Sequence, residues 1–386
     1  MGRGFLKMFS RKIFLLVLVA GARWPLVGHS EPPLNVSLTG YLRNQLIFLQ
    51  LPAQEQEYTD NATRLRLQLT GEKDDNFSFQ VTYDLELQAG DFTRSDAFSL
   101  LKAVERPTFL DLDAVLINER SLYLSHRIYR GFLKWSLSEV EIVAGRHSID
   151  WGSGRAWNIA NPFFPVNPLD IERADRQGTD GISFLFPLGS TSSLTGVLAG
   201  QRGANESFVA GCFRRNLWEA DTSLVGYHGT SGSGFGVDFS RSLGSAEVHG
   251  AVVYQHGQEI FSRWVAGLDY SFPGTLKFSL EYYRNGNGTR RAEGYQWFSL
   301  LQGKEQFLAR DYLYWATDYE LTPLVRFQNI FLVNLNDGGW YLNPVLKYSP
   351  TANFEISLGW SGFFAGARDE FFNYPDRGYL RGQFFF

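Results

Sequence analysis

The sequence is poor in the residues that build cross-links and metal cages. It holds one cysteine, Cys212, among 386 residues. One thiol excludes an internal disulfide and a cysteine-based zinc site, and no glycine-rich phosphate-binding motif is present. We therefore expect no cofactor and no resident metal, and we expect Cys212 to be a packed wall residue.

Long apolar runs are also scarce. Four basic residues within 1–12 precede an apolar run at 13–22, which ends on small residues. This order is typical of a secretory signal peptide, with cleavage after Ala22 or after Ser30. Ten apolar residues are too few to span a bilayer as a helix, and no other run approaches the required length. We predict a signal peptide at 1–22 and a single domain at 31–386, either released beyond the inner membrane or inserted in the outer membrane as a barrel.

The chain also has no excess of basic over acidic residues. Without residues 1–22, thirty-two Lys and Arg face forty Asp and Glu, a net charge of −8. This balance argues against nucleic acid as a partner. What the chain has instead is 16% aromatic residues and 39 glycines. A transmembrane barrel needs this mixture of aromatic girdles, apolar belt, polar lumen and tight turns.

Apolar and polar residues alternate with period two along nearly the whole chain. The clearest segment is 76–88, where one face carries Phe77, Phe79, Val81, Tyr83, Leu85 and Leu87. Period two is the pattern of a β-strand. Eighteen such strands are predicted, at 36–48, 62–70, 76–88, 122–135, 138–149, 179–187, 192–202, 206–216, 220–229, 234–243, 245–257, 261–272, 275–285, 306–319, 323–336, 339–348, 352–363 and 377–386.

The lengths of the connections sort by parity. Connections after even strands are short, whereas every long one follows an odd strand: 49–61, 89–121, 150–178, 286–305 and 364–376. Short turns at one end and long loops at the other are the outer-membrane pattern. We predict an all-β, antiparallel, up-and-down transmembrane barrel of about 18 strands, with 16 as the alternative because residues 203–234 divide ambiguously.

The last ten residues, 377–386, form an alternating strand that ends on three phenylalanines. In a closed barrel this strand would pair with the first instead of leaving an exposed edge. The ending resembles the carboxy-terminal strand of bacterial outer-membrane barrels. The resemblance implies that Phe384 and Phe386 are read by the barrel-assembly machinery, and that outer-membrane lipid and lipopolysaccharide surround the protein. A soluble sandwich that happens to end on Phe is the alternative.

The connection 150–178 is long and rich in tryptophan, phenylalanine and proline. A loop of this length inside a compact domain is usually functional, and this one is too apolar to extend into water. We predict that it folds into the lumen and narrows the pore, lined by Arg155, Asp170, Glu172, Arg173, Asp175 and Arg176. Alternatively, it caps the barrel from outside or plugs it.

A family resemblance rests on this region. The run 145–154 reads Gly-Arg-His-Ser-Ile-Asp-Trp-Gly-Ser-Gly, and an Asn-Pro pair, an Arg/Asp-rich stretch and Gly-Thr-Asp-Gly follow it. It resembles alginate-export-type porins and related substrate-specific outer-membrane porins, which are barrels of 18 or a similar number of strands. The resemblance implies a porin, whereas several short outer connections weigh against polymer export.

Charged residues fall on the polar faces of the predicted strands. Strand 377–386 closes on strand 36–48, so a basic stripe should form from Arg43, Arg64, Arg66 and Arg381, beside Asp84 and Glu86. Arg130 and Arg326 also lie on polar faces. A basic stripe in a narrow pore favours anions. The alternative is a nearly neutral lumen balanced by Glu141, Asp269, Glu281 and Glu355.

These features predict a passive channel for small hydrophilic solutes, with a preference for anions or carboxylated sugars. No enzymatic activity is expected, because alternation puts His147 and Ser148 on opposite faces although Asp150 is near. The rival hypothesis is a barrel with a plugged lumen in a structural, adhesive, lipid-handling or enzymatic role.

Overall fold

The computed structural model describes residues 34–51, 56–103, 109–163, 168–169, 178–200, 207–229, 232–257, 260–301 and 305–386. The predicted signal peptide and both cleavage sites lie outside these ranges, as do Asp170, Glu172, Arg173, Asp175 and Arg176. Within the described ranges, no helix has the length and apolar character needed to cross a bilayer.

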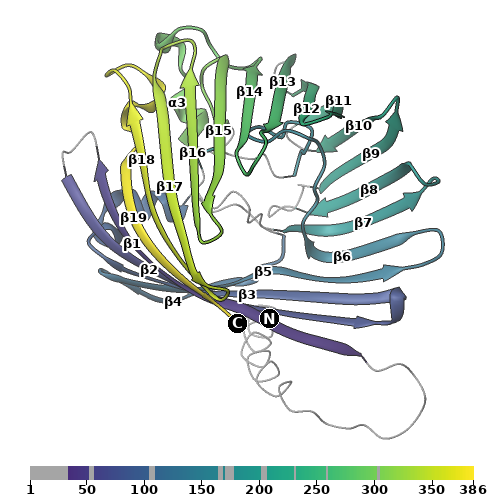
Figure 1. The fold of residues 1–386 in the computed structure, drawn as a ribbon, viewed down its shortest axis with the longest axis horizontal. Coiled ribbons are helices and arrows are strands. Elements are labelled where there is room, and N and C mark those ends of the chain that lie inside the picture. The colour runs from purple at the N-terminus through teal and green to yellow at the C-terminus, as the bar shows by residue number, and fades with distance from the viewer. Residues whose placement is uncertain are drawn as a thin grey trace, which may run out of the picture. The chain divides into compact units, whose positions relative to one another are not determined.

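One antiparallel sheet closes on itself through the pairing of β1 with β19 (Figure 1). Its strands are β1 (Asn35–Leu51), β2 (Gln56–Lys73), β3 (Phe77–Gly90), β4 (Asp113–Glu119), β5 (Leu122–Ser136), β6 (Glu141–His147), β7 (Thr179–Pro187), β8 (Ser192–Gly200), β9 (Ser207–Leu217), β10 (Ala220–Gly229), β11 (Gly232–Leu243), β12 (Ala246–His256), β13 (Ile260–Ser271), β14 (Lys277–Asn285), β15 (Asp311–Thr322), β16 (Val325–Asn334), β17 (Trp340–Thr351), β18 (Phe354–Phe364) and β19 (Asp376–Phe385). The predicted closed barrel of 18 strands is confirmed, with β4 as an extra strand.

Short helices occupy the connections. They are η1 (Asp74–Asn76), η2 (Phe92–Arg94), α2 (Asp96–Ala103), η3 (Ala292–Gly294), α3 (Trp297–Leu301) and η4 (Glu370–Asn373). All except η1 lie in long connections, and these follow odd strands of the prediction. The predicted separation of short turns from long loops therefore holds.

The two faces of the wall differ as the alternation requires. On β19, Leu380 is 48% exposed and faces outward, whereas its neighbour Tyr379 is 3% exposed and faces the lumen. An apolar exterior around a polar interior is what a bilayer demands of a barrel. Cys212 is buried on β9, as expected of a packed wall residue.

The turns at the end of the barrel with short connections have the backbone geometry of tight β-hairpins. Between β9 and β10, Trp218 and Glu219 have φ angles of 51° and 63°. Positive φ at both central positions is the two-residue geometry that matches the twist of flanking strands. Trp218 is 89% exposed, as suits an aromatic side chain at a membrane surface.

Two predicted connections are wrong in detail. The connection 49–61 is mostly strand, because β1 continues to Leu51 and β2 begins at Gln56. The strand extends beyond the apolar belt at residues 56–61, which are polar on both faces. The alternation of apolar and polar residues that predicts a strand is therefore lost there. The connection 89–121 contains α2 and the strand β4.

Strand β4 fills a gap that β6 leaves. β6 pairs with the Gly131–Ser136 half of β5 and ends at His147, whereas β4 pairs with the other half, from Leu122 to Arg127. Arg146 holds this junction from a fully buried position. Its guanidinium donates to Asp180 at 2.7 Å, to the Ile128 carbonyl at 2.8 Å and to the Leu110 carbonyl at 2.7 Å. The wall therefore stays continuous where the chain turns inward.

Candidate functional site: the lumen and its in-folded segment

The chain that leaves β6 runs across the inside of the barrel (Figure 1). Trp151, Ala156 and Trp157 are all buried there. Trp157 stacks on Tyr283 of β14 at 5.0 Å between ring centroids, and Trp151 meets Phe163 at 5.3 Å. We call the described part, residues 148–163, the in-folded segment. Its position within the lumen agrees with the predicted fold-back and not with a cap outside the barrel.

Backbone hydrogen bonds anchor the in-folded segment to one wall carboxylate. Glu281 of β14, 1% exposed, accepts from the backbone N–H groups of Arg155 at 2.7 Å, Ala156 at 3.2 Å and Trp157 at 2.8 Å. The ring Nε2 of His249 lies 3.0 Å from the same carboxylate. A buried carboxylate is stable only with such partners. Glu281 is thus the principal anchor of the segment.

A second acid holds the start of the in-folded segment. Asp238 of β11 accepts from the backbone N–H of Ser153 at 2.9 Å and from its hydroxyl at 2.8 Å. Sequence analysis treated Glu281 only as a possible balancing charge and did not single out Asp238. Acidic residues on the lumen face of neighbouring strands were the available signal.

The Arg155 side chain joins two more wall acids. Its Nε donates to Asp269 of β13 at 2.8 Å, and a terminal nitrogen donates to Glu247 of β12 at 2.9 Å. Burial alone would lower the pKa of this guanidinium, but the hydrogen bond and charge of Asp269 raise it overall. Arg155 is the one predicted constriction residue that the described ranges include, and 48% of its side chain is exposed.

The predicted basic stripe lies on the lumen face of β19, β1 and β2. Arg43 and Arg64 are directly opposite in the β1–β2 register, and Arg381 donates to Gln45 at 3.0 Å. Three guanidinium groups and the carboxylate of Glu86 line a hollow of about 180 Å³ here. Like charges placed opposite one another repel, and a carboxylate such as that of Glu86 lessens this repulsion.

The two predicted acids pair with part of this stripe. Arg66 donates its Nε to Asp84 at 2.6 Å, and Arg64 lies 2.6 Å from Glu86. Among the residues that line the hollow, three are arginines and one is a glutamate.

A β-bulge extends the basic wall onto β5. The register between β3 and β5 shifts at Thr82 and Tyr83, which puts Arg130 opposite the inward Thr82. The same shift brings Arg127 to the lumen face, opposite Asp84, and Arg127 pairs with Asp113 at 3.0 Å. Sequence reasoning missed Arg127, since strict alternation cannot put residues 127 and 130 on one face.

Arg326 stands apart from the stripe. It lies at the short-turn end of β16 and donates to both oxygens of Asp318, at 2.6 and 2.7 Å. Three strands, β17 to β19, separate β16 from β1. The structure thus brings together the predicted basic residues of β19, β1, β2 and β5, but not Arg326.

Three of the four acids offered as a neutral balance are engaged away from the stripe, whereas Glu355 of β18 lies one strand from β19 and accepts from Ser357 at 3.1 Å. Asp269 and Glu281 bind the in-folded segment, and Glu141 pairs with Lys134 at 2.6 Å. Along the closed strand order, β12 lies opposite β2. The lumen therefore has a basic wall facing an acidic wall to which the in-folded segment is attached.

A buried carboxyl joins the long loops at the mouth. Glu370 of η4 accepts from the backbone N–H of Leu308 at 2.7 Å and from Asn334 at 2.9 Å. Tyr312 donates to it as well, and Asp337 lies beside it, held by the Glu370 backbone N–H at 2.9 Å. Burial raises the pKa of Glu370 to about 7 from 4.5, against the lowering effect of these hydrogen bonds.

The raised pKa of Glu370 predicts that the packing of the long loops around it depends on pH. A raised pKa means that packing of the loops is fully favoured below pH 4.5 and weakens as pH rises through 7. Amide hydrogen exchange around residues 305–310 and 370–374, corrected for intrinsic rates, should show weaker protection at pH 8 than at pH 5. Glu370→Gln should remove the difference. An equal pH effect in that variant would contradict the assignment to Glu370; the facing Tyr295, Tyr312 and Tyr374 cannot cause it, because burial raises the pKa of each further above this pH range.

His147, Ser148 and Asp150 do not form a catalytic triad. The His147 Nε2 contacts Ser183 on β7, and Ser148 donates instead to Asp150 at 3.1 Å. The described geometry gives no support to acyl-transfer chemistry at these adjacent residues.

Comparison with known proteins identifies relatives of the fold. No family model matches the chain, and no curated protein matches its sequence. Among solved structures, the chain is similar to OccK5 (OpdH) of Pseudomonas aeruginosa, with 13% identity, TM-score 0.56 and coverage of 91% of this chain and 98% of that one. Acinetobacter baumannii OccAB4 gives 10% identity, TM-score 0.56 and coverage of 92% and 98%. The outer membrane protein opdK of P. aeruginosa gives 11% identity, TM-score 0.56 and coverage of 91% and 98%. At these identities the likeness shows the fold, an 18-stranded barrel resembling outer-membrane porins.

Proposed function

We propose that this chain is an outer-membrane channel through which small hydrophilic solutes diffuse passively, without covalent chemistry. The observation that carries the proposal is the in-folded segment, fixed by Glu281 and Asp238 to one wall of a closed barrel. A segment held this way narrows the lumen, and its described anchors on β11 and β14 lie across the barrel from β1 and β2. The fold shared with opdK and the Occ proteins supports the same function.

The basic wall formed by β19, β1 and β2 points to an anionic solute. Arg43, Arg64 and Arg381 line its hollow with one carboxylate, Glu86. Guanidinium groups bind carboxylates through two parallel hydrogen bonds. Anions or carboxylated sugars are therefore the proposed solutes, in keeping with the resemblance to alginate-export-type porins. Assembly by the barrel machinery and contact with lipopolysaccharide belong to the same proposal.

The anion preference is tested by the reversal potential in a salt gradient. The native protein should be anion-selective, and Arg43→Ser combined with Arg64→Ser should shift the reversal potential toward cations, because two lumen charges are removed. Arg326→Ser is the matched control, since that arginine faces the lumen but is paired with Asp318 away from the stripe. A cation-selective native channel, or equal shifts in both variants, would refute the preference.

A parallel flux assay separates the channel from its rivals. Liposomes containing the protein should release small solutes while their lipids stay intact. Lipid hydrolysis without solute release would favour a barrel-borne enzyme, and neither event would favour a plugged structural barrel.

A further inference from the structure

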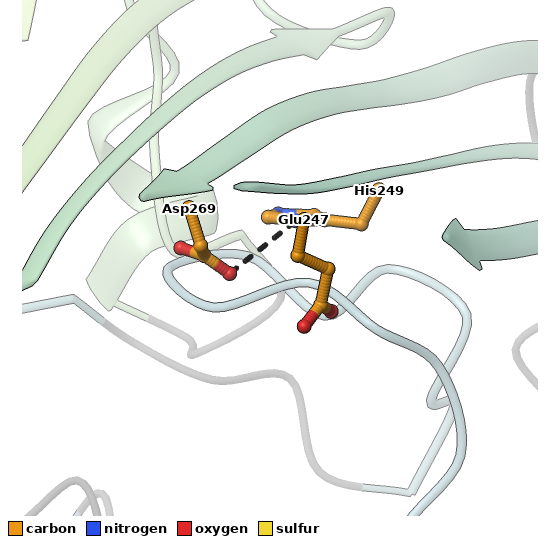
Figure 2. A group of neighbouring side chains, drawn as sticks. All are labelled: Glu247, His249 and Asp269. Carbon is orange, nitrogen blue, oxygen red and sulfur yellow. Dashed lines mark ion pairs between the residues drawn. The ribbon is translucent and has the colours of Figure 1, made fainter. Parts of the chain in front are cut away.

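A histidine and two carboxylates converge on the acidic wall, beside the in-folded segment. Glu247 and His249 lie on β12 and Asp269 on β13, and Glu247 is directly opposite Asp269 in the register. One ligand atom from each lies within 4.8 Å of the others (Figure 2). Gly267 faces His249 across the strands, and a Cβ there would lie 2.1 Å from the imidazole Nε2. The glycine therefore makes the space that the ring occupies.

The hydrogen bonding of His249 fixes which nitrogen must carry a proton. Its Nε2 lies 3.0 Å from Glu281, whose oxygens already accept three backbone N–H groups of the in-folded segment. A carboxylate accepts and does not donate, so Nε2 carries a proton, and in the neutral ring Nδ1 then holds the lone pair. A carboxylate behind an imidazole is the usual support of a metal-bound histidine.

The free nitrogen of this ring is buried and points at an acid. The His249 side chain is fully buried, and its Nδ1 has no hydrogen-bond partner within the described ranges. It lies 3.7 Å from Oδ2 of Asp269. In the neutral ring this lone pair would face a carboxylate, an unfavourable contact that either a proton on Nδ1 or a bound cation would relieve.

In this structure the cation beside the acids is Arg155. It bridges Asp269 and Glu247 but makes no hydrogen bond to the imidazole that the structure records. Half of its side chain faces the lumen, and the backbone of residues 155–157 is anchored separately at Glu281. The guanidinium can therefore leave while the segment stays in place.

We propose that Glu247, His249 and Asp269 form a binding site for a divalent transition-metal ion such as Zn²⁺, which displaces the guanidinium of Arg155 into the lumen. One imidazole nitrogen and carboxylate oxygens are ligands that zinc accepts. The metal would neutralise both carboxylates and supply the missing partner of Nδ1. Sequence analysis predicted no metal site, and these ligands lack a recognised spacing in the chain.

The test is a titration of the refolded full-length protein with Zn²⁺, against a chromophoric chelator. Arg155→Met should bind one ion per chain several-fold more tightly than the native protein, because no guanidinium competes. In the Arg155→Met background, His249→Gln and Glu247→Gln should each abolish this binding. His256→Gln, a second histidine of β12, is the matched control and should retain it. Heat-modifiable migration would verify that each variant folds.

Two results would overturn the site. One is the absence of stoichiometric Zn²⁺ binding in Arg155→Met, and the other is unchanged binding in folded Glu247→Gln of that background. A consequence for transport rests on the proposed function: Zn²⁺ should make the native channel more anion-selective by freeing Arg155. Zn²⁺ binding to a folded protein that carries no current would count against the channel proposal and leave the metal site standing, whereas binding with unchanged selectivity would show only that Arg155 does not set the selectivity.

Discussion

Excision of the in-folded segment should raise the single-channel conductance severalfold while the barrel still folds. The wall is closed by hydrogen bonds between strands, and none of these pairings includes residues 148–163. Replacing residues 150–175 by a short glycine-serine link therefore removes the obstruction and spares the wall. Planar-bilayer recordings of refolded protein measure the effect. The anchors at Ser153 and Arg155–Trp157 favour removing the whole segment.

A point substitution provides a milder version of the same experiment. Glu281→Gln removes the charge that holds three backbone N–H groups, so the segment should loosen and the current should become noisier. Glu320→Gln, an exposed acid near the turn after β15, is the matched control and should behave as native. An excision variant that folds but conducts as the native protein does would show that the segment does not narrow the pore.

Deletion of the last three residues should abolish folding of the barrel altogether. Phe384 pairs with Leu42, and Phe386 exchanges two backbone hydrogen bonds with Gly40, at 2.8 and 3.0 Å. Without these residues the seam opens at the short-turn end, and unpaired backbone groups would face lipid at a cost of several kcal/mol each. The measurement is heat-modifiable migration on gels after expression and after refolding.

Phe385→Ala is the control for this truncation. Its side chain meets Tyr41 at 6.3 Å between ring centroids, while its backbone keeps the pairing with β1. This variant should fold, so a loss of folding can be assigned to the missing strand pairs and to the proposed assembly signal at Phe384 and Phe386. A truncated protein with native migration would refute both.

Local alternation made most of the fold predictable. Period two fixes which side chains face lipid, and the register then follows from one short turn after another. The strand predicted at 76–88 is observed at Phe77–Gly90, and the strand predicted at 220–229 is observed with those bounds. Alternation fails where a strand leaves the apolar belt, as in residues 56–61, or where a bulge reverses its faces, as at Tyr129.

The site was predictable only in part, because its key contacts join residues distant in sequence. The stripe of Arg43, Arg64 and Arg381 could be found, since closure of the barrel makes their strands neighbours. The anchor at Glu281 could not, because it lies 124 residues from Trp157 and depends on how the segment enters the lumen. Strand β4 could not be predicted for a similar reason. It pairs with the part of β5 that β6 leaves unpaired, and this depends on where β6 ends.

The most direct test of a constricted channel is the single-channel conductance of the native, refolded protein in a planar bilayer. Discrete, long-lived current steps are predicted, with a zero-current potential that favours anions in a salt gradient. A correctly folded barrel that inserts and carries no current would contradict the proposed function.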